Sequence, residues 1–287
     1  MKIDLEKIKQ EKPIQSLLQF GIINIDKPTG PTSFSVTDYI RKSLDLNKTS
    51  HMGTLDPAVS GVLPILLGRA CRLSDYFMHK NKTYVGIMRL HKEVDEKTLK
   101  KVILKFIGKI KQLPPVRSRV KRAIREREVI SFDIIEIEGK DILFSTEVQA
   151  GTYIRKICDD MGKEPGIEGA HMLELRRIRA GMFSEDKIYT LYDFDKAVKS
   201  YQEGDEKPLR EMIVPAEIIS TFMPVIEITH KAVLKQLLTG KPLMKSDIKD
   251  KLPEEERFCI FNKDVFIGVY KKVDEGDIIA RAEFVFN

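Results

Sequence analysis

The sequence has few cysteines, no long apolar run and no internal repeat. Its three cysteines, Cys71, Cys158 and Cys259, lie far apart, and none has a His or a second Cys at metal-ligand spacing. This pattern argues against a disulfide framework and against a metal site, and it predicts free thiols in a reducing compartment. The apolar run at residues 61–68 is far shorter than a bilayer span, and residues 1–12 are charged. We therefore expect a cytoplasmic protein with no membrane partner.

The composition is that of a folded protein. Apolar residues make up 42% of the 287-residue chain and charged residues 32%, which is too apolar for a disordered chain. A chain of this length can bury one large core or two. The default expectation is therefore a catalytic domain with a smaller appended unit.

The net charge of +6 reflects one lopsided stretch, residues 109–128. Two acidic residues in it, Glu126 and Glu128, are outnumbered by eight basic ones: Lys109, Lys111, Arg117, Arg119, Lys121, Arg122, Arg125 and Arg127. Such an asymmetry fits a polyanion such as nucleic acid. A solvated surface run is the alternative, and charge alone does not decide between them.

Hydrophobic spacing predicts the elements of an α+β protein. Residues 20–25, 62–67 and 83–90 read as strands, and residues 129–137 and 142–148 flank a turn typical of a hairpin. Helices are predicted after a cap at Thr32 or Ser33, around 73–77, over 99–110, from a cap at Thr152 to Gly162, and over 191–198 after Thr190. Because strands and helices do not alternate strictly, we expect a mixed, largely antiparallel sheet. Short strands at 258–261, 265–270 and 278–286 predict a small β-rich C-terminal unit.

Residues 51–57 have no helical or strand period and are predicted to form a loop. An Asp in the sequence Gly-Thr-Leu-Asp-Pro is usually a turn former, because its carboxylate satisfies local backbone donors. The motifs that accompany Asp56 favour a functional role instead. In chain order they are KPTGPTS (27–33), GTLDP (53–57), KTY (82–84), GTYIR (151–155) and LRR (175–177). In this ordered set the chain resembles the TruB-type pseudouridine synthases.

Three further motifs resemble the guide-RNA-dependent branch of that family, typified by dyskerin. They are RLH (89–91), PPVRS (114–118) and GAHMLELRR (169–177). The segment between Tyr84 and Tyr153 is also compact beside that of the bacterial stand-alone tRNA enzyme. The resemblance implies an α+β pseudouridine-synthase catalytic domain over 20–213 and a small β-rich PUA RNA-binding domain over 214–287. Residues 1–19 would form an N-terminal extension packed on the C-terminal unit.

The resemblance implies three catalytic residues. Isomerising uridine breaks the N-glycosidic bond and rejoins the base through carbon, which needs one ionised carboxylate and no cofactor. Asp56 matches the family's catalytic aspartate, and Arg155 matches the arginine that pairs with it and favours its ionised form. Tyr84 matches a tyrosine that stacks on the target base and helps to remove a ring proton. Attack on C1′, addition to the uracil ring and deprotonation of C2′ all stay open for Asp56.

Four other residues are expected at the substrate site. Tyr153 and Leu175 fall at positions that line the uracil pocket in the family, although core packing would explain either. His51 matches a histidine that contacts RNA, with a structural hydrogen bond as the alternative. Lys27 is grouped with them as a support of the catalytic loop rather than a part of the chemistry.

The resemblance also implies partners. A guide RNA of the H/ACA type would leave one substrate uridine unpaired, which lowers the cost of extruding it. Small Nop-type and Gar-type proteins and a kink-turn-binding ribosomal protein would complete the particle, acting on rRNA and also on tRNA. A stand-alone tRNA T-loop enzyme is the alternative with the same chemistry. A non-catalytic RNA-binding scaffold is the alternative from another class.

Overall fold

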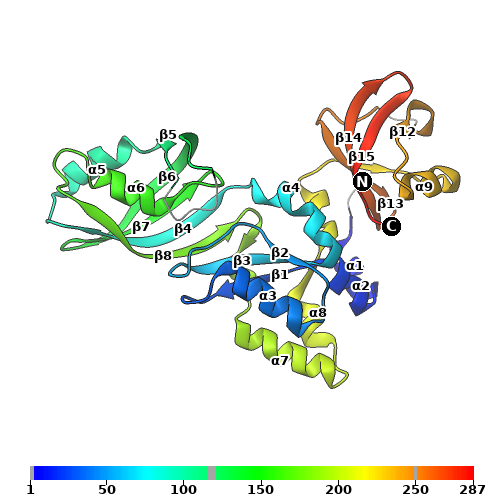
Figure 1. The fold of residues 1–287 in the computed structure, drawn as a ribbon, viewed down its shortest axis with the longest axis horizontal. Coiled ribbons are helices and arrows are strands. Elements are labelled where there is room, and N and C mark those ends of the chain that lie inside the picture. Colours follow the sequence, from blue (N-terminus) through cyan, green and yellow to red (C-terminus); the bar gives the residue numbers. More distant parts are fainter. Residues whose placement is uncertain (1–2, 115–120, 249–250) are drawn as a thin grey trace.

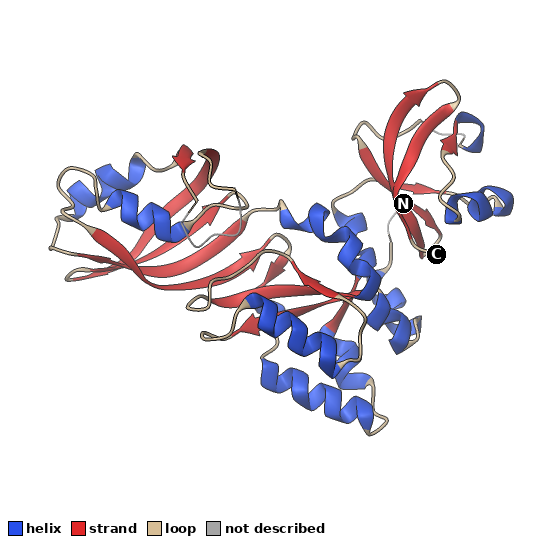
Figure 2. Cartoon of the chain, viewed as in Figure 1, coloured by secondary structure: helices blue, strands red, loops and turns tan. Residues whose placement is uncertain are grey.

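The computed structural model describes residues 3–114, 121–248 and 251–287. Two sheets organise them, a ten-stranded sheet that runs the length of the larger unit and a five-stranded sheet in the C-terminal unit (Figures 1 and 2). Helices cover the larger sheet in separate groups, with α3 and α7 near one end and α5 and α6 near the other (Figure 1). In PPVRS, the residues 115–118 lie outside the described ranges, as do Arg117 and Arg119 of the basic stretch.

The large sheet is mixed and largely antiparallel, which confirms the predicted α+β class. Its main path is β10 (Ile213–Pro215), β1 (Gly21–Lys27), β3 (Ser60–Leu67), β8 (Ala170–Ala180), β4 (Lys82–Leu90), β7 (Asp141–Val148), β6 (Arg125–Glu138) and β5 (Gly108–Gln112). Two short strands lie off this path, β2 (Thr49–His51) on β3 and β9 (Phe183–Ser184) on β8. Only the β3–β8 pair is parallel among these pairs. Because β10 reaches Pro215, this sheet extends two residues beyond the expected domain boundary at 213.

The helices begin where capping residues were expected in two cases. The Thr32 hydroxyl accepts from the Ser35 amide at 2.9 Å and starts α3 (Ser33–Ser43). Thr190 and Asp193 form a reciprocal capping box at the start of α7 (Leu191–Gln202). The helix predicted around 73–77 is confirmed as α4 (Ser74–Met78), which follows a 3₁₀ turn, η1 (Gly68–Leu73).

The prediction of one helix over 99–110 is wrong beyond Leu104. The helix is α5 (Glu96–Leu104), and Ile110 lies in the strand β5 instead. Gly108 has a φ of +92°, a left-handed conformation that ends helical geometry and that glycine adopts at little cost. Beyond it, Ile110 pairs with Arg127 of β6, so tertiary pairing overrides the apparent helical spacing.

Other local predictions also need correction. Thr152 does not cap α6 (Ile154–Met161), because its hydroxyl donates to the Gln149 carbonyl at 2.8 Å and Tyr153 is the residue before the helix. His51 closes the short strand β2 rather than opening a loop. The strand β8 was not predicted, and neither was the short helix α8 (Lys207–Met212).

The C-terminal unit is a five-stranded sheet with its own core. Its strands are β11 (Val225–Glu227), β13 (Arg257–Asn262), β14 (Val265–Glu275), β15 (Ile278–Val285) and β12 (Leu243–Met244), in that spatial order, with α9 (Lys231–Leu238) beside them. One face packs on Leu237 of α9 through Phe258, Ile260 and Tyr270. The opposite face, which includes Cys259 and Phe261, joins a core cluster shared with the larger unit.

Of the two N-terminal helices, α1 (Leu5–Glu11) lies against this shared cluster, and Ile3 and Ile8 are buried in the same cluster as Phe261. The buried residues of α2 (Ile14–Gln19) belong to the core of the larger unit. Lys7 pairs with Asp264 of the C-terminal unit at 2.9 Å. Burial of these apolar side chains contributes roughly 25 cal/mol for each Å² removed from water, so α1 fastens the two units together.

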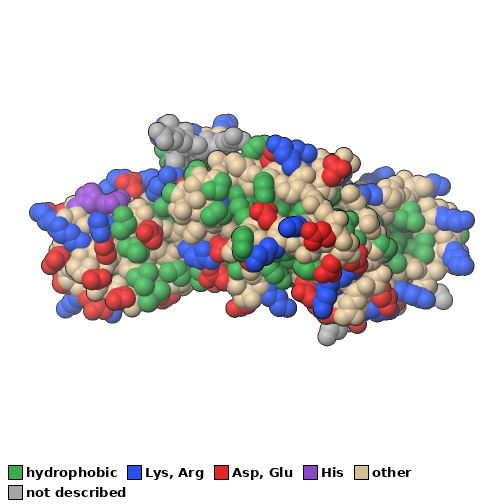
Figure 3. Space-filling model, turned by 90° about the horizontal axis from the view of Figure 1, so that it is seen from below, with side chains coloured by type: hydrophobic (Ala, Val, Ile, Leu, Met, Phe, Trp, Pro, Cys, Tyr) green, Lys and Arg blue, Asp and Glu red, His purple; other side chains and the backbone are tan. Residues whose placement is uncertain are grey.

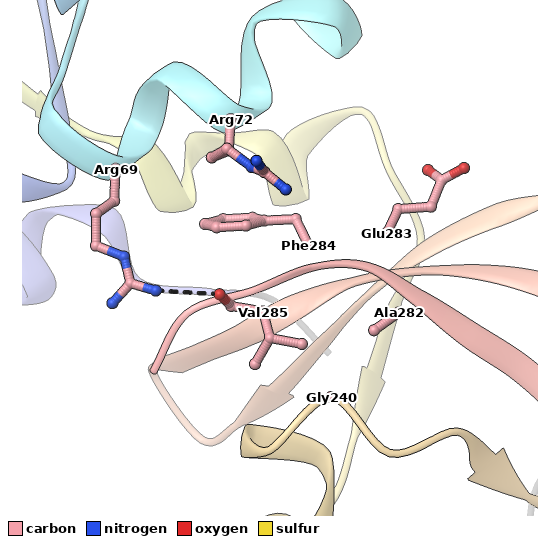
Figure 4. Close-up of a pocket in the computed structure, with 7 residues that line it drawn as sticks. All are labelled: Arg69, Arg72, Gly240, Ala282, Glu283, Phe284 and Val285. Atoms are coloured by element: carbon pink, nitrogen blue, oxygen red, sulfur yellow. Dashed lines mark hydrogen bonds between the residues drawn. The ribbon is translucent and has the colours of Figure 1, made fainter. Parts of the chain in front are cut away.

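A cleft remains between the two units. Its volume is about 450 Å³, and Arg69 and Arg72 face Phe284 and Val285 across it (Figure 4). Arg69 Nη2 donates to the Val285 carbonyl at 3.2 Å, and its guanidinium lies 4.6 Å from the Phe286 ring centroid. The cleft is therefore bridged at one end and basic along one wall.

All three cysteines are buried free thiols. Burial raises the pKa of the Cys71 thiol to about 11 and that of Cys158 to about 12. These thiols therefore stay protonated near neutral pH and have little nucleophilic character. Among the described helices, none combines the length and apolar character needed to cross a bilayer.

Candidate active site

Lys27 supports the loop that carries Asp56. Its side chain is completely buried, and its ammonium donates to the carbonyls of Pro28 at 2.8 Å, Val59 at 2.8 Å and Pro57 at 3.3 Å. Burial lowers the pKa of Lys27, and the Asp56 carboxylate opposes that effect. Because its three donors are used on backbone carbonyls, Lys27 supports the loop and is not placed to contact a substrate directly. That position agrees with the supporting role expected for it.

Two other buried side chains fix the same loop. The Ser33 hydroxyl, at the start of α3, donates to the Leu55 carbonyl at 3.0 Å and accepts from the Leu55 amide at 2.8 Å. Arg177 of β8 donates to the Gly53 carbonyl at 3.0 Å and to the Val62 carbonyl at 2.7 Å. The backbone on both sides of Asp56 is therefore clamped before any ligand arrives.

A close backbone approach lets Arg177 reach the loop. Gly61 pairs with Arg177 in the parallel β3–β8 contact and has a φ of +102°. A Cβ at Gly61 would lie 2.2 Å from the Arg177 carbonyl oxygen, far inside van der Waals contact. Only glycine fits there, so the GTLDP motif and the second arginine of LRR are brought together by a glycine that neither motif contains.

Asp56 and Arg155 are in contact, as the family resemblance implies. Arg155 Nη2 donates to Asp56 Oδ2 at 2.6 Å, a charge-assisted contact. The Asp56 side chain is 48% exposed and that of Arg155 54% exposed, so the pair is open in the chain by itself rather than enclosed. Open access is what a bulky ligand such as a nucleobase requires.

The position of Arg155 depends on a buried amide in β5. Gln112 is 3% exposed, and its side chain donates to the Tyr153 carbonyl at 3.1 Å and accepts from the Tyr153 amide at 3.0 Å. Tyr153 directly precedes α6, so these two hydrogen bonds locate the helix that carries Arg155 in its first turn. The partly buried Tyr153 therefore anchors its helix through its backbone.

Tyr84 and Leu175 lie on neighbouring strands beside the loop. Tyr84 of β4 is opposite Arg177 of β8, and Leu175 is opposite Gly86 two residues further along. Both side chains are 8% exposed, so each belongs mainly to the core of the large unit. Burial lowers the pKa of Arg177, and interaction with Tyr84 raises it. Tyr84 is thus joined to the Asp56 loop through Arg177.

His51 is held close to this arginine as well. It ends β2, opposite Ile65 of β3, and is partly buried. Its Nδ1 atom is buried and makes no hydrogen bond to any described residue. Burial lowers the pKa of His51, and the Arg177 guanidinium lowers it further. His51 therefore stays neutral near pH 7.

The residues that sequence reasoning missed are the buried polar ones. Gln112 received no role, Ser33 was considered only as a helix cap, and Lys82 and Arg177 were noted only as motif members. Lys82 is 5% exposed, its ammonium donates to the Lys80 carbonyl at 2.6 Å, and burial lowers its pKa to about 8. In sequence such residues look like surface residues, and no local signal marks them as buried.

The fold and the site together define a class of enzyme. The mixed sheet of an α+β fold carries a clamped loop with one accessible carboxylate, that of Asp56. The Arg155 guanidinium is bound to one of its oxygens. Such a carboxylate can act as a nucleophile or as a base. Within the described ranges, no three His, Cys, Asp or Glu side chains gather where they could hold a metal ion.

Comparisons with known proteins narrow this class. The model of the TruB family pseudouridylate synthase N-terminal domain matches residues 41–154, and that of the tRNA pseudouridylate synthase B C-terminal domain matches residues 155–220. A probable tRNA pseudouridine synthase B of Methanopyrus kandleri is 46% identical over 78% of this chain and 66% of its own length. The protein of the same name from Archaeoglobus fulgidus is 44% identical over 78% of this chain and 69% of its own. The chain belongs to the TruB family of pseudouridine synthases, enzymes that isomerise uridine in RNA.

Solved structures match nearly the whole chain. A chain of a Cbf5–Nop10–Gar1 complex superposes with a TM-score of 0.86 at 37% identity, covering 97% of this chain and 88% of that chain. A chain of an H/ACA RNP bound to a substrate RNA gives a TM-score of 0.83 at 36% identity, with 97% and 89% covered. The match covers the C-terminal unit as well as the large sheet, so both units have counterparts in these assemblies.

Proposed function

We propose that this chain converts uridine to pseudouridine in RNA, with Asp56 as the catalytic carboxylate. The observation that carries the proposal is the 2.6 Å contact between Asp56 and Arg155, formed on a clamped loop in a chain of the TruB family. The contact occupies Oδ2 and leaves Oδ1 without a hydrogen-bond partner among the described residues. A carboxylate oxygen without such a partner, on a half-exposed side chain, can attack C1′, add to the uracil ring or take a proton from C2′.

The neighbouring side chains serve the same reaction. The target uridine leaves its stack and lies between Asp56 and Tyr84, whose ring stacks on the base and whose hydroxyl helps to remove a ring proton. Leu175 and Tyr153 line the pocket, and His51 contacts the RNA. Arg155 keeps the carboxylate ionised once the bound base excludes water around it.

Guide dependence is the form of this activity that we favour. It rests on the match across 97% of the chain to a component of an H/ACA RNP bound to a substrate RNA. The compact region between Tyr84 and Tyr153 also supports guide dependence, because its described residues belong mainly to α5 and to four strands of the sheet. A guide that leaves one uridine unpaired would reduce the cost of extruding it, which is a few kcal/mol.

The C-terminal unit is proposed to act as a PUA RNA-binding domain. The cleft next to it exposes Arg69 and Arg72 on one wall, where phosphates of a guide RNA would be neutralised (Figure 4). The fastening of α1 to this unit would keep its distance from Asp56 constant. Residues 1–19 would then be an N-terminal extension packed on the C-terminal unit, with 20–213 as the catalytic domain and 214–287 as the PUA domain.

The partners proposed are those of a guide-RNA particle. Small Nop-type and Gar-type proteins would bind the catalytic unit, and a kink-turn-binding ribosomal protein would bind the guide RNA. The substrates would be rRNA and also tRNA, in the cytoplasm. Solved complexes that contain Nop10 and Gar1 beside a similar chain support the first two partners.

Reconstitution tests both levels of the proposal. Purified chain, with wild-type or Asp56→Ala sequence, is mixed with a substrate RNA, with or without H/ACA RNA and accessory proteins, and pseudouridine is mapped at single positions. We expect conversion at the guided uridine with the wild-type chain and none with Asp56→Ala, although both bind the RNA. Conversion by Asp56→Ala would rule out the catalytic assignment.

A stand-alone tRNA enzyme is the second candidate. It is favoured by the name of the curated relatives, probable tRNA pseudouridine synthase B. Full activity of the bare chain on the T-loop uridine of tRNA would establish it and would contradict strict guide dependence. The scaffold alternative required that Asp56 and Arg155 lie apart, and their contact argues against it.

A further inference from the structure

Two exposed histidines face each other at the far tip of the large sheet. His91 directly follows β4, and His171 is the second residue of β8, which pairs with β4 there. His91 Nε2 and His171 Nδ1 are 3.3 Å apart, and the ring centroids are 5.4 Å apart. Figure 3 shows a histidine patch exposed to solvent at one end of the molecule. The motif RLH and the first four residues of GAHMLELRR, which carry these histidines, have no part in the catalysis proposed above.

The separation of the two nitrogens suits a shared metal ion better than a strong hydrogen bond. An N–H donor and its acceptor usually lie about 2.7 to 3.2 Å apart, so 3.3 Å is long for a hydrogen bond between the rings. Two imidazole nitrogens bound to one tetrahedral ion at about 2.0 to 2.1 Å each are separated by roughly 3.3 to 3.4 Å. The rings are therefore already spaced as the two ligands of a zinc-like ion.

The backbone is built to place His91 in this position. Its amide donates to the Gly169 carbonyl at 2.9 Å, which joins the end of β4 to the start of β8. Gly169 has a φ of +109°, and a Cβ there would lie 2.2 Å from His91 Nδ1. The ring thus rests against the glycine on its Nδ1 side, and its Nε2 atom points toward His171.

The charged neighbours leave the ring nitrogens free to bind a cation. Asp141 is bonded to Arg89, with Arg89 Nε 2.7 Å from Asp141 Oδ1, and Glu168 is paired with Lys92. Both carboxylates are thus neutralised by their own partners. Within the described ranges no third His, Cys, Asp or Glu completes a cluster, so water would occupy the remaining positions of a bound ion.

We propose that His91 and His171 form a surface site for a divalent transition-metal ion of the zinc class. The ion would be bound by His91 Nε2 and His171 Nδ1 and would tie the end of β4 to the start of β8. Tyr84 lies seven residues back along β4, which is roughly 23 Å at about 3.3 Å per residue, so the site is separate from the catalytic residues. Imidazole ligands select zinc, copper or nickel and not the oxygen-seeking Mg²⁺ that accompanies RNA.

The test is metal binding by the purified full-length chain without a histidine tag. Calorimetric titration with Zn²⁺, Cu²⁺ and Mg²⁺ is compared for wild type, His91→Gln, His171→Gln and the control His79→Gln, which alters an exposed histidine elsewhere. We expect one equivalent of Zn²⁺ per wild-type chain, tighter binding of Cu²⁺, and no binding of Mg²⁺ at this site. Loss of either ligand should weaken Zn²⁺ binding at least about tenfold, since loss of an outer partner alone costs about 10 to 100-fold.

A second measurement separates this site from scattered surface binding. Zn²⁺ should raise the thermal midpoint of wild type and of His79→Gln, and it should not raise that of His91→Gln or His171→Gln. Each glutamine replaces an exposed ring, and unfolding midpoints without metal check that the variants are folded. Absence of saturable Zn²⁺ binding to wild type, or equal loss of binding in all three histidine variants, would overturn the proposal.

Discussion

Arg155 Nη2 lies 2.6 Å from Asp56 Oδ2, joining two residues that are 99 positions apart in the chain. The position of each residue is fixed independently of the other. Lys27, Ser33 and Arg177 hold the loop that carries Asp56. The start of α6 positions Arg155. Two rigid supports therefore meet at a pair that is itself half exposed. The pair can open toward a ligand without unfolding either support.

Replacing Arg155 should impair catalysis far more than stability. In Arg155→Ala the rate of pseudouridine formation should fall by about 10² to 10³-fold, the usual cost of losing one aligned donor to a reacting charge. Arg155→Lys should recover part of the rate, because it keeps the charge and loses the planar fork. The free energy of unfolding should change by less than about 0.5 kcal/mol, since exposed ion pairs contribute little. Single-turnover kinetics and urea denaturation provide both values, and an unimpaired Arg155→Ala would remove the pair from the mechanism.

Gln112 should affect the reaction although it lies outside the substrate site. Gln112→Met keeps the volume of the side chain and removes both hydrogen bonds to the Tyr153 backbone. We expect a loss of roughly 1 to 3 kcal/mol in stability from the unpaired buried groups. We also expect a lower kcat with little change in RNA affinity, because Arg155 is displaced. A variant with the stability loss and a normal kcat would show that α6 is positioned independently of this amide.

Gly61 should tolerate no side chain, because of space as well as backbone conformation. Gly61→Ala and Gly30→Ala share a positive φ, +102° and +106°, but a Cβ at Gly30 has nothing within 4 Å whereas one at Gly61 meets the Arg177 backbone at 2.2 Å. The left-handed conformation alone should cost about 1 to 2 kcal/mol in Gly30→Ala. Gly61→Ala should cost a further 1 to 3 kcal/mol or so through overpacking. Chemical denaturation of the two variants isolates the steric part, and equal losses would contradict the close approach.

Lys82 should make the free energy of unfolding depend on pH in the alkaline range. Its pKa is about 8 in the folded chain against 10.5 for the free side chain. Between these values the unfolded chain keeps a proton that the folded chain has released, so wild type gains stability as pH rises from about 8 to 10.5. The gain should reach at most about 3 kcal/mol at 1.36 kcal/mol per pKa unit.

Lys82→Met should remove this dependence. The difference in unfolding free energy between wild type and Lys82→Met should therefore shift in favour of wild type over that pH range and stay constant below pH 8. Lys199→Met, which alters a lysine 77% exposed on α7, is the matched control and should show no such trend. A difference that does not change with pH would mean that Lys82 keeps its ordinary titration.

The helices and strands with a regular hydrophobic spacing were predictable from the sequence, and the points where the chain departs from that spacing were not. The strands around residues 20–25, 62–67 and 83–90 and the helix after Thr190 follow directly from hydrophobic spacing and capping chemistry. Ile110 continues the spacing of α5, yet it pairs with β6, because a sheet edge offers hydrogen bonds that the isolated sequence does not reveal. β8 was missed because its Arg-rich sequence lacks the apolar alternation of a core strand.

The candidate site was predictable only through resemblance. Asp56 and Arg155 have no common period, so their contact could not be derived from spacing. Lys27, Arg177 and Gln112 are polar residues whose burial depends on carbonyls or amides supplied by distant turns. Their roles become visible only when the fold has brought those backbone groups to them.

The described part of the basic stretch should set the salt dependence of RNA binding. Lys121 and Arg122 are both exposed next to β6, where each can neutralise a phosphate. Log affinity falls with log salt by about 0.7 to 0.9 per phosphate contact, so Lys121→Gln/Arg122→Gln should reduce that slope by roughly 1.4 to 1.8. The control pair Lys196→Gln/Lys199→Gln removes the same charge from α7 and should leave the slope nearly unchanged. Filter binding at several salt concentrations measures both slopes, and an equal reduction in the two variants would assign the effect to net charge rather than to this surface.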